Sequence, residues 1–315
     1  MDEFILEKTD FPNLGEKYEG KVRDNYTQGD KRIIITTDRI STFDIIVGCV
    51  PWKGQVLNQM AAFWFEKTKD IIGNHIISVP DPNVMVVKEC EPVMVEMVVR
   101  EYVTGVTKTS IWYSYQQGIR NFCGNKLSEG LKKDQKLPKP ILTPSSKAEK
   151  GGHDESISPE EVVKRGLLMQ NEMDELKEIS FRLFERGKEI VGKQGVILVD
   201  TKYEFGKLNG KFVLIDEIHT PDSSRFWHKD TYEKLFKEGK EQRKIDKEYV
   251  RSWLADHGFV GEGPVPKIPK QIFDEASKRY IEAYEKITGQ SFKEHREAPI
   301  AKRIEANLKK SGYWK

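Results

Sequence analysis

The stretch from Val199 to Glu217 reads V-D-T-K-Y-E-F-G-K-L-N-G-K-F-V-L-I-D-E, and it predicts two β-strands, 195–205 and 211–218, joined by Lys207-Leu208-Asn209-Gly210. Because side chains alternate across a strand, Asp200, Lys202 and Glu204 share one face of the first strand. Charged groups at period two among so many apolar neighbours are unusual for a hairpin. The hairpin is therefore the most informative part of the sequence and the first candidate site.

The turn decides which acidic groups of this hairpin can meet. A two-residue turn pairs Glu204 with Ile215 and puts Asp216 on the opposite face. A three-residue loop with Gly210 in a bulge pairs Lys202 with Asp216 and leaves Glu204 diagonally across, about 7–8 Å away. In that register both carboxylates can reach one Mg²⁺ that also holds phosphates. The alternative to a metal site is a cross-strand Lys–Asp ion pair beside a solvent-facing glutamate. The metal site requires the bulged turn, which we expect.

The rest of the chain predicts an α+β fold in three parts: a β-rich lobe over 1–92, an α/β lobe over 93–228 and helices over 229–315. Residues 132–158 are rich in Lys, Pro, Ser and Gly and are expected to form a long loop, either functional or disordered. Ser158-Pro159 has the composition of a helix start, and one long helix is expected to run to about Gly192. Other predicted strands lie at 32–37, 44–50, 84–88 and 93–100, and other predicted helices at 55–72, 231–237, 247–257, 270–287 and 299–310.

Composition limits the classes of function. The 315 residues carry 52 basic and 50 acidic side chains, a net charge of +2, which argues against nucleic acid or an anionic membrane as the main partner. Cys49, Cys90 and Cys123 are far apart and have no metal-ligand spacing, so a reducing compartment is expected. No apolar stretch approaches the length of a membrane span, and the N-terminus lacks the features of a signal peptide. We expect a cytoplasmic protein.

Three further segments are candidates for anion binding. Gly20-Lys21-Val22-Arg23-Asp24 could lie over phosphates, but it lacks the P-loop framework, and a surface turn is the alternative. Ser145-Ser146-Lys147 and the following glycines could form a lid over an anion, or merely a linker. Arg100 and Arg225 each stand at a predicted strand end, where a guanidinium can clamp a phosphate or form a structural ion pair.

Taken together, these segments resemble the phosphoribosylaminoimidazole-succinocarboxamide synthase (SAICAR synthetase) family. The match runs in order along nearly the whole chain, and its last three motifs are highly specific. The motifs are G-K-V-R-D (20–24), T-T-D-R-I-S-T-F-D (36–44), V-V-R-E-Y (98–102), L-T-P-S-S-K-A-E (142–149), H-D-E-S-I-S (153–158), V-D-T-K-Y-E-F-G (199–206) and D-E-I-H-T-P-D-S-S-R-F-W (216–227).

The resemblance implies an ATP-dependent ligase of purine biosynthesis. It would join L-aspartate to the carboxylate of carboxyaminoimidazole ribonucleotide (CAIR) through an acyl phosphate, with ATP and Mg²⁺ as cofactors. It also implies a SAICAR synthetase-like fold, with a small β-rich ATP-binding lobe of the ATP-grasp or kinase kind, an α/β lobe and C-terminal helices. A monomer or a small homo-oligomer is expected.

The resemblance also implies roles for individual residues, carried over motif by motif. Lys21 and Arg23 would contact the ATP phosphates, Met94 and Glu96 would lie at the adenine, and Glu204 and Asp216 would bind Mg²⁺. Lys202, Asp200 and Asp222 would be the catalytic charged groups. The substrate contacts would come from Ser41, Arg100, Ser145, Ser146, Lys147, Asp154 and Arg225.

One position departs from the family pattern. The resemblance implies a serine after Thr104-Gly105, and Val106 follows instead. The hydroxyl that contacts the substrate phosphate would then come from Thr107, Thr109 or Ser110.

Two rival functions remain at this stage. A ligase or kinase for another small carboxylate would keep the acidic hairpin and Lys21 but change the pockets around Arg100 and Arg225. A non-enzymatic RNA-binding protein would use the lysine-rich C-terminal helices, which the near-zero net charge disfavours.

Overall fold

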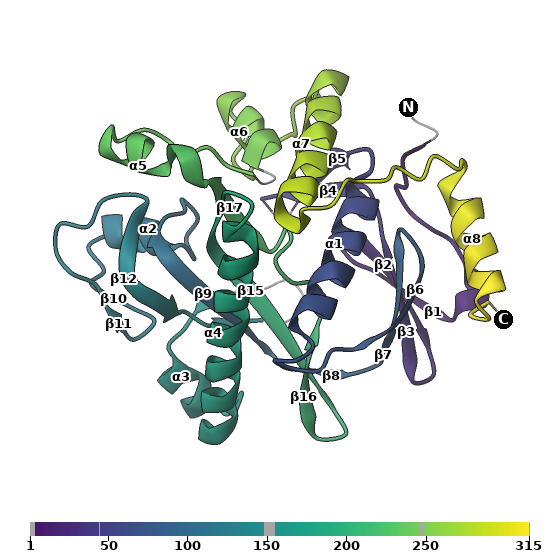
Figure 1. Ribbon diagram of the computed structural model, residues 1–315, viewed down its shortest axis with the longest axis horizontal. Coiled ribbons are helices and arrows are strands. Elements are labelled where there is room, and N and C mark those ends of the chain that lie inside the picture. The colour runs from purple at the N-terminus through teal and green to yellow at the C-terminus, as the bar shows by residue number, and fades with distance from the viewer. Residues whose placement is uncertain (1–3, 44, 148–154, 246–247, 315) are drawn as a thin grey trace.

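The computed structural model describes residues 4–43, 45–147, 155–245 and 248–314. It contains a five-stranded and an eight-stranded sheet, as Figure 1 shows, both with antiparallel pairing throughout. The α+β fold class is therefore confirmed. The first sheet has the strand order β1 (Glu16–Glu19), β2 (Arg23–Gln28), β3 (Lys31–Thr36), β7 (Val84–Lys88) and β6 (Ile76–Asp81).

The central strand of this sheet, β3, is buried on both faces. Ile33 and Ile35 pack with α8 (Ile300–Lys310), whereas Ile34 belongs to the cluster that contains the buried face of α1 (Lys53–Thr68). A strand covered on both faces has no solvent side, which explains its continuous apolar run. A separate two-stranded ribbon, β4 (Arg39–Thr42) and β5 (Ile45–Cys49), follows the sheet in sequence.

The second sheet is built around β15 (Val196–Leu208), which pairs with four other strands. Helix α4 (Gln170–Gly192) packs over β15 and β9 through its apolar face. Besides β15, this sheet contains β14 (Glu155–Ser156), β13 (Ser145–Ser146), β9 (Val95–Val103), β16 (Lys211–Ile215), β12 (Gln135–Leu142), β17 (Ser224–His228) and β8 (Glu91–Pro92).

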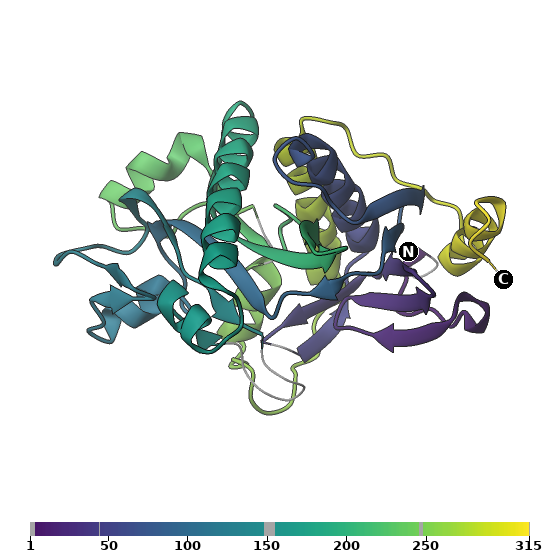
Figure 2. The same cartoon turned by 90° about the horizontal axis from the view of Figure 1, so that it is seen from below.

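The largest apolar core is continuous across both sheets. Helix α7 (Lys270–Thr288) packs on α1, and the two lie side by side in Figures 1 and 2. The predicted three-part division of the chain remains a prediction. The remaining elements are η2 (Pro12–Leu14), α2 (Ile111–Gln116), β10 (Asn121–Phe122), β11 (Asn125–Lys126), α3 (Pro159–Lys164), α5 (Lys229–Lys237) and α6 (Glu248–Asp256).

Two sequence-based predictions about the middle of the chain were wrong. Residues 135–142, expected to be loop, form β12, which pairs only with β9. An edge strand tolerates prolines that cannot donate to a ladder, and the pairing is irregular between Lys136 and Ile141. The single long helix is in fact two helices, because Gly166 has a φ of 70° between α3 and α4. The start at Ser158 is confirmed: its hydroxyl accepts a hydrogen bond from the Glu161 N–H at 3.1 Å.

The three cysteines are half-buried and form no disulfide. Burial raises the pKa of the Cys49 thiol to about 11 and that of Cys123 to about 12. Both thiols are therefore protonated at neutral pH and poor nucleophiles. No helix in the described ranges is long and apolar enough to cross a membrane.

Candidate active site

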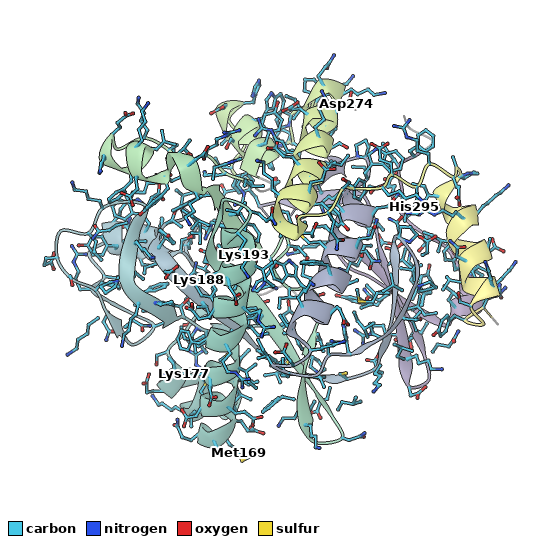
Figure 3. All side chains as sticks on the ribbon, viewed as in Figure 1. Met169, Lys177, Lys188, Lys193, Asp274 and His295 are labelled. Carbon is cyan, nitrogen blue, oxygen red and sulfur yellow. The ribbon has the colours of Figure 1, made fainter. Side chains whose placement is uncertain are left out.

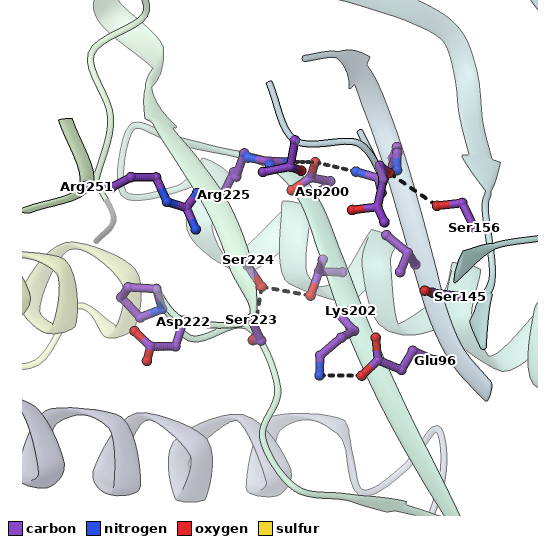
Figure 4. A pocket seen from close by; sticks show the side chains of 16 residues that line it. Glu96, Ser145, Ser156, Asp200, Lys202, Asp222, Ser223, Ser224, Arg225 and Arg251 are labelled. Carbon is purple, nitrogen blue, oxygen red and sulfur yellow. Dashed lines mark hydrogen bonds and ion pairs between the residues drawn. The ribbon is translucent and has the colours of Figure 1, made fainter. Parts of the chain in front are cut away.

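A polar cavity of about 360 Å³ lies over the β9, β15 and β17 strands. Strand β15 contributes Asp200 and Lys202 to its wall, and β9 contributes Glu96 and Arg100. Figure 4 shows Asp200 beside Arg225 at one end and Lys202 beside Glu96 toward the other. Of the predicted site residues on these strands, Glu96, Arg100, Asp200, Lys202 and Arg225 therefore line one cavity, whereas Glu204 lies outside the lining and contacts it through Lys202.

At the first end, two arginines share one carboxylate. The register pairs Asp200 with Arg100 on one side and with Arg225 on the other. Asp200 Oδ2 accepts a hydrogen bond from Arg225 at 2.5 Å and another from Arg100 at 3.2 Å. Arg100 also donates to Thr143 Oγ1 at 2.9 Å, and burial together with Arg225 lowers its pKa despite Asp200. Two cations on one anion leave excess positive charge, which suits an anionic ligand.

Several hydroxyl groups line the same cavity and narrow the choice left open after Gly105. Thr107 and Thr109 lie in the lining. Ser110 is buried, and its Oγ lies 2.7 Å from the Thr107 hydroxyl, so it turns back into its own loop. Of the three candidates Thr107, Thr109 and Ser110, the first two therefore reach the cavity.

At the other end, Lys202 is surrounded by carboxylates. Its ammonium donates to Glu96 Oε1 at 2.8 Å and to Glu204 Oε1, and Lys147 donates to the second oxygen of Glu204. Burial opposes the charge of Lys202, but Glu204, Glu96 and Asp216 outweigh it and raise its pKa. Burial alone would likewise raise the pKa of Glu204, and the two lysines lower it instead. Both groups are charged at neutral pH.

The predicted bulge at the hairpin tip was wrong. The pairing runs from Glu204–Ile215 to Leu208–Lys211, so Asn209 and Gly210, with φ of 51° and 75°, form a two-residue turn. Asp216 nevertheless does not continue on the opposite face. It follows the last residue of β16 and has a φ of 63°, which turns its side chain out of the strand alternation.

The redirected Asp216 carboxylate faces Arg23, whose guanidinium donates to Oδ1 at 2.6 Å and lies 3.0 Å from Glu217. Burial and the carboxylates of Glu204 and Glu217 raise the pKa of Asp216, in opposition to Arg23. The negative charge of Glu204 contributes to this rise, so the two carboxylates are close enough to affect each other's ionisation. Two neighbouring carboxylates are a suitable donor set for a divalent cation that completes its shell with phosphates.

The strand β2 that carries Arg23 is anchored by a buried arginine. Arg39 donates to the carbonyl oxygens of Gly20 at 2.9 Å and Lys21 at 3.0 Å, and to Asp24 Oδ1 at 2.8 Å. The Lys21 side chain is exposed on this turn. The G-K-V-R-D motif is therefore a fixed turn between β1 and β2 rather than a free surface loop.

The other predicted site residues lie around this cavity. Ser145 lines it, while Ser146 and Met94 lie beside it, where the Lys147 N–H donates to the Met94 carbonyl at 3.2 Å. Ser41 lies on β4, outside the lining of the cavity. Asp154 lies outside the described residues. No group of three or more His, Cys, Asp or Glu side chains within the described ranges is placed to hold a metal ion.

Some residues at the cavity were missed by sequence reasoning. Arg251, on α6, lines the cavity together with Arg225. Lys53, on α1, is fully buried and lies 2.9 Å from Asp222. For Lys53 the sequence holds no signal, because the residue lies just before the helix predicted over 55–72. For Arg251 the sequence holds no local signal, because the contact depends on how α6 packs.

A cavity with an arginine pair at one end and a lysine–carboxylate cluster at the other defines an enzyme that binds anionic, phosphate-bearing substrates. The comparisons agree with this class, since the SAICAR synthetase family model matches residues 16–267. The chain belongs to the SAICAR synthetase family and is an ATP-dependent ligase of purine biosynthesis.

Individual relatives cover almost the whole chain. The phosphoribosylaminoimidazole-succinocarboxamide synthase of Legionella pneumophila (strain Lens) is 47% identical over 308 residues, 97% of this chain and 98% of its own. The enzyme of the same name from Bacteroides thetaiotaomicron is 47% identical over 309 residues, which cover 96% of this chain and 97% of its own. The Saccharomyces cerevisiae SAICAR synthase structure complexed with SAICAR has a TM-score of 0.80 at 30% identity, covering 92% of this chain and 100% of that one. The structure of a SAICAR synthetase in complex with ADP has a TM-score of 0.66 at 28% identity, and the match covers 89% of this chain and 100% of that one.

Proposed function

We propose that this enzyme joins L-aspartate to the carboxylate of CAIR, with ATP converted to ADP and phosphate. The observation that carries this proposal is the two-ended cavity along β15. The Arg100–Asp200–Arg225 group suits a nucleotide 5′-phosphate, and the cluster of Lys202, Glu204 and Asp216 suits a triphosphate with its cation. One strand thus holds both anionic partners at a fixed separation.

The chemistry requires activation of a poor acylating agent. A CAIR carboxylate oxygen attacks the γ-phosphorus of ATP, the bond to the β-γ bridging oxygen breaks, and ADP leaves. The aspartate amine then attacks the acyl carbon, and phosphate departs with the former carboxylate oxygen. The proton released by the amine must pass to a nearby base, and Asp222 on the cavity wall is our candidate.

On the nucleotide side, we propose that Lys21 and Arg23 contact the phosphates and that the adenine lies against Met94 and Glu96. Glu204 and Asp216 would hold Mg²⁺, which offsets the negative charge of the phosphates when it is bound. Lys202 is placed among the carboxylates of this cluster and would face the transferred phosphoryl group.

On the substrate side, the arginine pair and Asp200 would fix CAIR, with Arg251 and the Thr107 and Thr109 hydroxyls adding contacts to its phosphate. The remaining proposed substrate contacts come from the neighbouring loops and β4: Ser41, Ser145, Ser146, Lys147 and Asp154. A cytoplasmic location, which the unpaired cysteines support, and a monomer or small homo-oligomer complete the proposal.

Isotope transfer tests the reaction and its intermediate together. With CAIR labelled by ¹⁸O in the carboxylate, one ¹⁸O should appear in the released phosphate, because that oxygen bridges carbon and phosphorus in an acyl phosphate. Omission of CAIR should abolish ADP release, and omission of aspartate should abolish SAICAR formation. Phosphate without ¹⁸O, or ADP release that needs neither substrate, would contradict the proposal.

A further inference from the structure

Asp222 is held from behind by side chains of two different helices. Lys53 Nζ, from the first turn of α1, lies 2.9 Å from Asp222 Oδ2. The Tyr280 hydroxyl, from α7, donates to Asp222 Oδ1 at 2.8 Å. One carboxylate oxygen therefore accepts a hydrogen bond and the other faces an ammonium group, and Figure 4 shows Asp222 on the wall of the cavity.

The position of Lys53 calls for an explanation beyond packing. Its side chain is 0% exposed and that of Asp222 is 8% exposed. Burial of an ion pair is costly, and an apolar pair of similar volume often stabilises a fold as well or better. Lys53 does not line the cavity, whereas Asp222 does. The lysine thus contacts the cavity wall indirectly, through the carboxylate of Asp222.

The two helices that hold Asp222 are themselves fixed to each other and to the first sheet. The Gly54 N–H donates to Asp38 Oδ1 at 2.8 Å, and a Cβ at Gly54 would lie 2.3 Å from the Thr36 carbonyl oxygen, so α1 begins directly against β3. Ser277 on α7 donates to the carbonyl of Pro51 at 2.8 Å, just before α1. Lys53 and Tyr280 therefore have a rigid common frame.

The main chain around Asp222 is also constrained. The Asp222 N–H donates to Thr220 Oγ1 at 3.3 Å, and the buried Thr220 hydroxyl donates to Glu217 Oε2 at 2.5 Å. With backbone and both carboxylate oxygens anchored, the orientation of the Asp222 side chain is set before any substrate binds. This is the preorganisation that a group for a substrate amine needs.

We propose that Lys53 and Tyr280 are positioning residues that hold the Asp222 carboxylate in the correct orientation for the amine of the amino-acid substrate. The inference rests on the proposed function, in which Asp222 receives that amine. On this proposal, the contact between α1 and α7 supports catalysis, although both helices are remote in sequence from the residues at the two ends of the cavity.

Steady-state kinetics with each substrate varied in turn tests the proposal. Tyr280→Phe removes one hydrogen bond to a charged group and should lower kcat/KM for aspartate about tenfold, while KM for ATP changes less than about twofold. Lys53→Met should lower kcat/KM for aspartate about a hundredfold, and Lys53→Arg should recover part of this loss. In an Asp222→Asn background, Tyr280→Phe should have no further effect.

The matched control is Tyr284→Phe. Tyr284 lies one turn further along α7, and its hydroxyl contacts Gln290 at 3.4 Å rather than the cavity, so this variant should behave as wild type. Equal losses for all three substrates, or a Tyr280→Phe effect that persists without Asp222, would overturn the proposal. Wild-type protein in the same assay distinguishes failure of this inference from failure of the proposed function. If the wild-type protein forms no aspartate-dependent product, the proposed function itself is wrong.

Discussion

The carboxylates of Glu204 and Asp216 are the residues on which nucleotide chemistry depends in our proposal. Glu204→Gln and Asp216→Asn keep the side-chain shape and remove one charge each. We expect each variant to lower kcat by at least about a hundredfold at ordinary Mg²⁺. The melting temperature should fall only modestly, because each substitution keeps the side-chain shape, although an amide NH2 replaces one oxygen of a carboxylate that accepts from Lys147, Lys202 or Arg23. Activity assays and thermal unfolding measure the two effects.

Glu172→Gln is the control for this prediction. Glu172 accepts a hydrogen bond from Lys207 of β15 at 2.6 Å, so it too is an acid paired with a lysine of that strand, but its partner is not the cavity-lining Lys202. This variant should keep full activity. If Glu204→Gln or Asp216→Asn is equally active, the metal assignment is wrong.

His219 makes stability depend on pH. It is fully buried, its Nε2 lies 2.7 Å from the Tyr203 hydroxyl and its ring meets the Trp64 edge. Burial lowers the pKa of His219 to about 3 from its usual 6.5. The unfolded chain therefore binds the proton more readily, so this contribution to stability is complete above about pH 6.5 and is lost as the pH falls toward 3.

From pH 7 to pH 5, the free energy of unfolding should fall by about 2 kcal/mol because of His219 alone. His219→Gln cannot titrate but can still hydrogen-bond to Tyr203. Its loss of stability over the same interval should therefore be smaller by about that amount. Urea unfolding of both proteins at the two pH values measures the difference, and identical losses would show that His219 is not the cause.

At the scale of elements, α4 packs against this histidine through a glycine. A Cβ at Gly187 would lie 2.5 Å from His219 Cε1 and 2.8 Å from Leu198 Cδ2. Gly187→Ala should therefore destabilise the fold by about 1–3 kcal/mol, although alanine is the better helix former. Gly192→Ala, at the end of the same helix with no neighbouring atom within 4 Å of the new Cβ, should cost nothing. Denaturant unfolding compares the two, and equal effects would contradict the packing argument.

Elements with strong local signals could be predicted from the sequence. The strand at 84–88 and the helix at 270–287 have predicted bounds within one residue of the structure, and the Ser158 cap forms as its sequence indicates. These features depend on periodicity and on neighbouring residues in the chain. Local chemistry was sufficient there.

Elements that depend on distant partners could not be predicted in this way. The strand at 135–142 exists because β9 offers an edge, and its prolines conceal it in the sequence. The turn of Asp216 toward the cavity involves Arg23, 193 positions away, and a positive φ that no pattern for aspartate requires. The candidate acids could thus be named from the sequence, whereas the way they meet could not.

Across the whole molecule, surface lysines are commonly paired with acids. In Figure 3, Lys188 and Lys193 lie along α4; Lys188 donates to Glu101 at 2.8 Å, and Lys193 donates to Glu189 at 2.9 Å. Such pairing disperses positive charge over the surface of the helix.

A buried ion pair joins the C-terminal helix α8 to strand β6 of the first sheet. Arg303 donates to both oxygens of Asp81 at 3.0 Å, and the Asp81 side chain is 0% exposed. Arg303→Met would leave that carboxylate buried without its cation and should lower the free energy of unfolding by about 3–5 kcal/mol. Lys309→Met, which breaks an exposed pair with Glu305 on the same helix, should cost less than about 0.5 kcal/mol. Urea unfolding of both variants tests whether α8 contributes to the stability of the first sheet. If both variants lose a similarly small free energy of unfolding, it does not.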